Sequence, residues 1–206
     1  MMGKLLKYSI ITIIILIAGY NSVTLSPLDE VKKSQNDAVF NARAYAENFI
    51  SNDVTSLPAT EVTEFLSQIS EDLDGYTEQY GKRLGISDAY NFILQGTGTV
   101  SSMEEEYVNL ILENEKSIHI ATDFIFGNAI RDGSAMADIG DYQNTMDFNS
   151  ISVELNNIVR EEIIPPFMKK AKVGDEVLFK GAVTVDVTDP QSDSLKIIPL
   201  LLKINE

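Results

Sequence analysis

The sequence of 206 residues predicts an α+β protein. Three features carry this prediction: a charged and then apolar N-terminal segment, helical periodicity through the first half, and alternation of apolar and polar residues through much of the second half. Hydrophobic residues make up 44% of the chain, which is enough for a sizeable core. We expect three parts: a signal anchor or signal peptide at residues 1–25, a helical arm at 26–85, and a β domain at 86–206.

The N-terminal segment predicts a place at the membrane. Lys4 and Lys7 precede an apolar run at residues 8–20, which is about 20 Å long as a helix. Neighbouring apolar residues bring this run close to spanning length, and the positive flank keeps the N-terminus in the cytoplasm. We therefore expect an uncleaved, single-pass anchor in the cytoplasmic (inner) membrane with the remaining chain on the extracytoplasmic side. A cleaved signal peptide is the second interpretation and a buried core helix the third.

Two helices are expected after the anchor. The first begins near Pro27 and carries apolar residues at helical spacing as far as Ile50. The second begins near Pro58 and keeps the same spacing until Gly81. Stripes of this kind usually face a core, so we interpret both helices as structural.

The β domain is expected to contain five strands and one helix. Strands are predicted at residues 92–100, 107–111 and 118–126, the third with a bulge near Thr122, and two more at 176–187 and 195–204. A helix opening near Asn149 should end at Pro165 and Pro166. Three strands, a helix and two strands is the order of a small five-stranded OB-like antiparallel barrel with the helix between strands 3 and 4. An open α+β sheet fits the same order.

Four blocks of the sequence resemble a known family. They are FNARAYAENF at 40–49, YGKRLGISDAYNFILQGTGTV at 80–100, FGNAIRDGSAMADIGDYQNTMDF at 126–148, and GDEVLFKGAV at 174–183 followed by IIPLLL. Together they resemble a bacterial family of predicted periplasmic lipoproteins, domain of unknown function 2291. The resemblance implies an exported, membrane-tethered protein, often encoded near sugar ABC transport systems, without an established activity. Tyr20 stands where the lipoprotein members have the lipidated cysteine, so tethering would depend on the N-terminal helix itself.

The third block supplies the candidate binding residues. They lie in the segment 124–148, which we call the central loop: Gly127, Asn128, Arg131, Asp132, Asp141, Tyr142 and Asn144. Arg131 beside Asp132 could offer a donor fork and an acceptor to a carboxylate or a sugar hydroxyl, with Tyr142 as a stacking face. In the alternative interpretation, which we favour, Arg131 and Asp132 pair within the protein and fix the loop to the barrel.

Composition excludes several function classes. The formal net charge is -15, so nucleic acid is not an expected partner. The chain has no cysteine and a single histidine, His119, and we expect neither a metal nor a cofactor. His119 is interpreted as a strand residue rather than a catalytic base.

These observations lead to two hypotheses on function. The first is a non-enzymatic, membrane-anchored extracytoplasmic binding or accessory module linked to sugar ABC transport, with the cell membrane and an ABC transporter component as partners. The second is a carboxylate-based hydrolase that acts on envelope glycans, for which no pair of acidic residues stands out by spacing.

Overall fold

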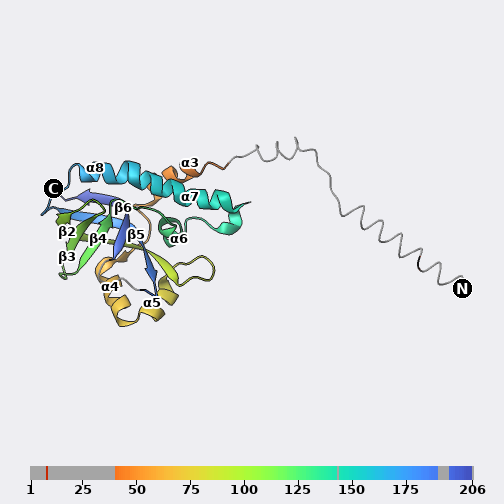
Figure 1. Cartoon of the computed structure of the whole chain (residues 1–206), viewed down its shortest axis with the longest axis horizontal. Helices are drawn as coiled ribbons and strands as arrows, with labels where there is room; N and C mark the ends of the chain where they lie inside the picture. The colour runs from red at the N-terminus through yellow and green to blue at the C-terminus, as the bar shows by residue number, and fades with distance from the viewer. Residues whose placement is uncertain (1–7, 9–39, 143, 190–194, 206) are drawn as a thin grey trace. The chain divides into compact units, whose positions relative to one another are not determined.

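The computed structural model describes residues 8, 40–142, 144–189 and 195–205 (Figure 1). The expected anchor lies outside these residues except for Tyr8, and residues 26–39 of the expected helical arm also lie outside them. Among the described ranges, no helix is long and apolar enough to cross a membrane. Residues 41–206 make up one compact unit, which contains all the elements described below.

The sheet of this unit is a closed barrel. Its five long strands in the described ranges are β2 (Ala89–Met103), β3 (Tyr107–Leu112), β4 (Ser117–Ala121), β5 (Glu176–Asp186) and β6 (Lys196–Ile204). They follow the order β2-β3-β4-β6-β5, and β5 pairs back onto β2. This closure is extensive, since it runs from Ala89 opposite Asp186 to Thr99 opposite Glu176. The two-residue strand β1 (Thr60–Glu61) adds to the outer edge of β2.

The predicted OB-like barrel is confirmed, with one correction to the strand directions. The pairing of β4 with β6 is parallel, with His119 opposite Lys196, whereas the other pairings in the ring are antiparallel. The reason is topological. A closed ring with an odd number of strands cannot alternate direction all the way round, so a five-stranded barrel needs at least one parallel pair.

The helices before the barrel share its core. In place of one long helix there are two, α4 (Val62–Glu71) and α5 (Leu73–Tyr80), and the Asp72 side chain between them accepts a hydrogen bond from the Gly75 amide as the cap of α5. Phe65 of α4 is fully buried and packs edge-on against Phe92 of β2. Residues 41–85 therefore belong to the same unit as the barrel rather than to a separate arm.

A buried ammonium group holds the first helical segment to the barrel. This segment consists of α3 (Ala42–Asn48) and a π-helical turn, η1 (Phe49–Asp53). Lys180 of β5 is only 7% exposed, and its Nζ donates to the carbonyl oxygens of Val54, Thr55 and Leu57 at 3.2, 3.2 and 2.7 Å. These carbonyls follow the C-terminal end of the helix, where backbone acceptors lack partners and positive charge is favoured. Burial lowers the pKa of Lys180.

The chain between β4 and β5 differs from the expected pattern at both ends. β4 ends at Ala121 instead of continuing to Phe126, because the Thr122 and Asp123 amides turn back to the Glu106 carbonyl. The helix α7 (Thr145–Ile158) begins earlier than predicted. It does not stop at the prolines but continues through the π-helical turn η3 (Val159–Ile163) into α8 (Ile164–Met168). Pro165 and Pro166 fall in the first turn of α8, where a backbone N–H is not needed.

Two shorter helical turns precede α7. They are α6 (Ala129–Ser134) and the 3-10 turn η2 (Ile139–Asp141). In Figure 1, α7 and α8 run along one side of the barrel, while α4 and α5 lie on another side. The central loop thus connects the barrel to the α7 layer through α6, which contacts both β2 and β5.

We predict that Lys180→Met lowers the free energy of unfolding by about 1–3 kcal/mol, because the carbonyl groups of Val54, Thr55 and Leu57 then lose the donor that they share. Lys203→Met is the matched control, since Lys203 lies exposed on the neighbouring strand β6 and should change stability by less than about 0.5 kcal/mol. Urea unfolding of the detergent-solubilised chain, followed by circular dichroism, measures both. Equal stabilities for the two variants would contradict a capping role for Lys180.

Candidate functional site

Arg131 is the centre of the central loop, and it lies inside the protein. Its side chain is fully buried. The Nε atom donates to the Asp132 carboxylate at 2.8 Å, and Nη1 donates to the Phe148 carbonyl and to Asn149 Oδ1, each at 3.2 Å. The guanidinium also lies 3.7 Å from the centre of the Phe148 ring. These contacts join α6 to the start of α7 from within, so Arg131 presents no open donor fork at the surface.

Tyr142 packs inside the loop, and Asn144 caps α7 at the surface. The Tyr142 ring packs at 5.6 Å from that of Phe148. Burial, followed by a hydrogen bond with Tyr45, raises the pKa of Tyr142 to about 12. Asn144 caps α7, because its Oδ1 accepts from the Asp147 amide at 2.8 Å and its Nδ2 donates to the Asp147 carboxylate.

The other predicted residues lie at the surface. Gly127 has φ of +87°, a conformation that favours glycine, and its carbonyl accepts from Asn156 Nδ2 at 2.9 Å. Asn128 precedes α6 without a side-chain cap, and Asp141 is exposed within η2. The structure therefore brings Arg131, Asp132 and Tyr142 together around Phe148, whereas Asn128 and Asp141 are not part of this cluster.

One face of this cluster opens into a cleft. This loop cleft, of about 360 Å³, lies between residues 81–84 and the segment from Asp132 to Ile139, with Phe148 also lining it. The cleft has positively charged residues on one wall, Lys82 and Arg83, and negatively charged residues on the other, Asp132 and Asp138. Asp132 is the one candidate residue of the sequence analysis that lines this cleft.

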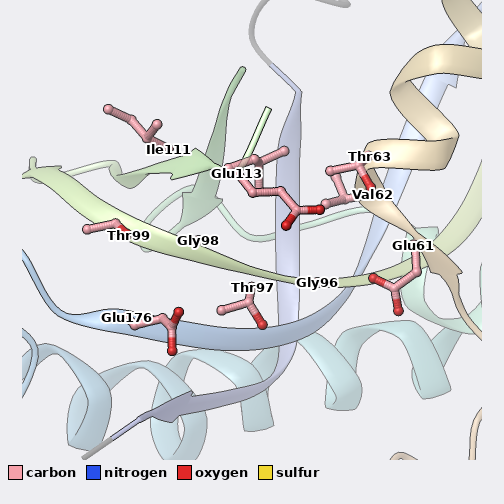
Figure 2. A pocket seen from close by; sticks show the side chains of 11 residues that line it. Glu61, Val62, Thr63, Gly96, Thr97, Gly98, Thr99, Ile111, Glu113 and Glu176 are labelled. Atoms are coloured by element: carbon pink, nitrogen blue, oxygen red, sulfur yellow. The ribbon is translucent and has the colours of Figure 1, made fainter. Parts of the chain in front are cut away.

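A second cavity lies on the barrel itself and has a different chemistry. This barrel groove, of about 340 Å³, is formed by β1, the middle of β2, the end of β3 and the start of β5. Figure 2 shows the carboxylates of Glu61, Glu113 and Glu176 placed around it, with the Thr97 side chain between them. Thr63 and Thr99 contribute further hydroxyl groups, and no lysine or arginine is among its lining residues in the described chain.

The floor of the barrel groove depends on a glycine. A Cβ atom at Gly96 would lie 2.7 Å from Val62 Cγ1 and 3.3 Å from the Phe179 ring. A side chain at this position would therefore displace α4 or the core and would occupy the groove. In the strand register, β1 pairs with Leu94 and Gln95, while β3 pairs only from Gly98 onward. The edge of β2 at Gly96 and Thr97 is thus left without a strand partner on this side.

The three glutamates differ in their hydrogen bonding. Glu61 accepts a hydrogen bond from Gln95 at 2.7 Å, and Glu176 accepts one from Asn205 at 2.7 Å. Glu113 is exposed and makes no hydrogen bond or ion pair with the described residues. The described chain contains no cluster of three or more acidic or histidine ligands that could hold a metal ion.

Sequence reasoning did not find the barrel groove. Its glutamates come from positions 61, 113 and 176, which are far apart in a chain with 31 acidic residues. The only usable sign was the Gly96-Thr97-Gly98 sequence within a predicted strand, because glycine in a strand often marks a close approach. The register that brings the three glutamates together cannot be read from that motif.

His119 lies on β4 away from either cavity and stacks on Tyr107 at 4.2 Å. Burial lowers the pKa of His119, and the charge of Lys196 lowers it further, while Glu104 opposes this effect. The interpretation as a strand residue agrees with this position.

The closed five-stranded ring, with its parallel β4–β6 pair and a helix before β5, defines an OB-like α+β protein. The fold is similar to the crystal structure of an OB-fold protein from Thermotoga maritima, with a TM-score of 0.73 and 25% sequence identity, over 82% of this chain and 100% of that chain. Residues 13–203 match the family model described as predicted periplasmic lipoprotein, domain of unknown function 2291, and the chain belongs to this family. This confirms the resemblance and supports an extracytoplasmic location for the globular domain. No curated protein matches the chain.

We predict that Arg131→Met lowers the free energy of unfolding by roughly 3 kcal/mol, because it leaves the partly buried Asp132 carboxylate without its ion pair and removes the hydrogen bonds from Nη1 to the start of α7. Arg83→Met serves as the control. Arg83 is exposed and lies 4.7 Å from the Tyr90 ring, a contact worth about 0.5–1 kcal/mol. Urea unfolding compares the two variants. A stable Arg131→Met protein that has lost binding would instead assign Arg131 to a ligand site.

Proposed function

We propose that this protein is a non-enzymatic, membrane-anchored extracytoplasmic binding module, and that its barrel groove holds a small polar ligand carrying an amine. The observation that carries this proposal is the lining of the groove: Glu61, Glu113 and Glu176 converge on one concave surface without a lysine or arginine among the lining residues in the described ranges. The volume of about 340 Å³ lies at the lower end of the range for small-molecule sites.

Charge complementarity sets the class of ligand. The carboxylates that line the groove would make charge-assisted hydrogen bonds with a bound organic cation. The chain as a whole has a net charge of -15, so its field also attracts cations and repels phosphates and acidic sugars. Polyamines and amino sugars therefore fit the groove better than neutral or anionic sugars.

Hydroxyl and backbone groups of the barrel groove are available to hydrogen-bond the uncharged part of such a ligand. Thr63, Thr97 and Thr99 line the groove beside the glutamates. On the edge of β2 between β1 and β3, Thr97 has no strand partner and offers its backbone groups. A ligand with both an amine and hydroxyl groups would use both sets of contacts.

The accessory role in sugar ABC transport rests on the family resemblance. The resemblance implies that members are exported and often encoded near such transporters, and the family description supports the extracytoplasmic side for the domain. In the proposed arrangement, the apolar residues 8–20 tether the domain beside a transporter component of the same membrane. If the ligand is an amine-bearing sugar, the barrel groove would bind a substrate of the same transporter.

A carboxylate-based hydrolase is the second candidate, and the same groove favours it. Two of its three glutamates could serve as acid and base if a glycan entered between them. Glu113 is the carboxylate without a partner, so it is the candidate proton donor or acceptor in that case. Release of reducing sugar from envelope glycan, lost in Glu113→Gln, would support the hydrolase and contradict a purely binding role.

We predict that polyamines or amino sugars raise the melting temperature of the detergent-solubilised full chain, whereas the matching neutral sugars do not. At 100 times the dissociation constant, binding adds about 2.7 kcal/mol of stability, which is several degrees in a domain of this size. Glu113→Gln should abolish the shift while it leaves the unliganded melting temperature unchanged. Glu78→Gln, an exposed change of the same kind on α5, should keep the shift. A shift of equal size in the Glu113 variant would contradict the proposed site.

We also predict that the protein stays with the membrane through residues 8–20. The full chain should remain in the pellet after an alkaline carbonate wash, because an apolar helix resists extraction by salt and pH. Replacing Ile13 and Leu16 with lysine should release the protein or block its export, since a charge near the helix centre costs about 2.5–3.5 kcal/mol. Release of the unaltered chain by the wash would exclude the anchor.

A further inference from the structure

Two large aromatic side chains project from the start of the central loop. Phe124 is 60% exposed and Phe126 is 72% exposed, whereas Ile125 between them is only 1% exposed. Burial of the middle residue fixes the segment to the protein and leaves its two neighbours outside. We call Phe124 and Phe126 the aromatic pair.

The backbone that carries the aromatic pair is held by hydrogen bonds on both sides. Before it, the Thr122 amide donates to the Glu106 carbonyl at 2.9 Å, and Thr122 Oγ1 donates to the Glu105 carbonyl at 2.9 Å. After it, Asn156 of α7 donates to the Gly127 carbonyl, and Arg160 donates to the Ile125 carbonyl. The pair is therefore presented by an ordered segment, which reduces the entropy lost when a partner binds.

Phe124 also has an unusual backbone conformation. Its φ is +52°, in the left-handed region that a bulky residue rarely adopts, and the Asp123 side chain accepts a hydrogen bond from its amide. The strain is maintained by the surrounding hydrogen bonds rather than relieved by moving the ring into the core. A strained residue held with its apolar side chain in solvent is typical of a binding surface.

Acidic side chains surround the aromatic pair. Glu104, Glu105 and Glu106 form the exposed turn whose carbonyls hold Thr122, and Asp123 directly precedes Phe124. Arg160 is the cation that contacts this segment in the described chain, and its guanidinium is engaged by the Ile125 carbonyl and Asn157. Four carboxylates and one guanidinium lie near the pair, so the net charge beside it is negative.

We propose that the aromatic pair is the anchor of a docking surface for a partner protein that offers an apolar pocket bordered by lysine or arginine. Aromatic residues in the centre of an interface, with charged residues at the rim, are the usual arrangement of binding hot spots. The negative rim disfavours an anionic lipid surface, and it disfavours a second copy of this chain, which carries the same charge. This surface is separate from the barrel groove and does not depend on the ligand proposed for it.

The test places a photoreactive phenylalanine analogue at Phe126 in the full chain and irradiates intact membranes at low salt. The expected result is one dominant adduct to another protein, whose cross-linked peptide contains apolar residues next to lysine or arginine. The yield should fall severalfold in Phe124→Ser, in Glu105→Lys with Glu106→Lys, and at high salt, because each change removes apolar contact or charge attraction.

The same analogue at Tyr80 is the control. Tyr80 is an aromatic residue that is 56% exposed on α5, and it should give no such adduct. Melting temperatures of all variants should match the original protein, since the altered side chains are exposed. Adducts to lipid, to a second copy of this chain, or to many proteins alike would overturn the proposal, and so would the absence of any adduct.

Discussion

The closure of β5 onto β2 is the constraint on which the remaining structure depends. β2 extends for 15 residues and pairs with β5 over most of that length, while its other edge is divided between β1 and β3. Both edges of β2 therefore have strand partners, and α4 approaches β2 closely at Gly96. The barrel groove lies where the pairing of β2 with β1 ends and its pairing with β3 has not yet begun. Glu61 belongs to β1, Glu113 directly follows β3, and Glu176 begins β5, so the acidic lining is a property of the closed barrel rather than of any one segment.

The barrel was predictable because its strands follow a simple alternation. Residues such as Leu110 and Ile118 are fully buried and recur at every second position, and the pattern holds within a few residues of each strand end. The strand number alone requires at least one parallel pair in the closed ring, but it does not show that this pair is β4–β6. The misplaced elements are those in which local hydrogen bonds override the pattern. Phe124 looks like a continuing strand in sequence, yet the Asp123 side chain and the Glu106 carbonyl turn the backbone away. Pro165 looks like a stop, yet a π-helical turn before it places it where a helix accepts proline.

The central loop shows why a distinctive sequence block and an open binding site are different things. Arg131 attracts attention because a charged residue among glycines and asparagines suggests recognition of a ligand. The structure uses it to join α6 to α7 through Asp132, Phe148 and Asn149. Burying a guanidinium demands several partners in fixed positions, so the residues around it are constrained by the fold itself. Glu113, in contrast, is one glutamate of many in the sequence and is notable only for where the barrel places it. The sequence alone could identify residues with demanding environments, but it could not show which surfaces they leave open.

The position of α3 determines how this domain would respond to mechanical load. Any tension transmitted along the chain from before Phe40 enters the domain at α3, ahead of every barrel strand. Arg43 of α3 holds Glu154 of α7 and both Glu161 and Glu162 of η3, and these contacts are about one-third exposed at the arginine. They would weaken as ionic strength rises, whereas the buried hydrogen bonds of Lys180 behind them would not. Under load, raised salt would therefore weaken the attachment of α3 to α7 and η3, while the buried side chains of Ala42 and Ala46 and the Lys180 hydrogen bonds continued to hold it.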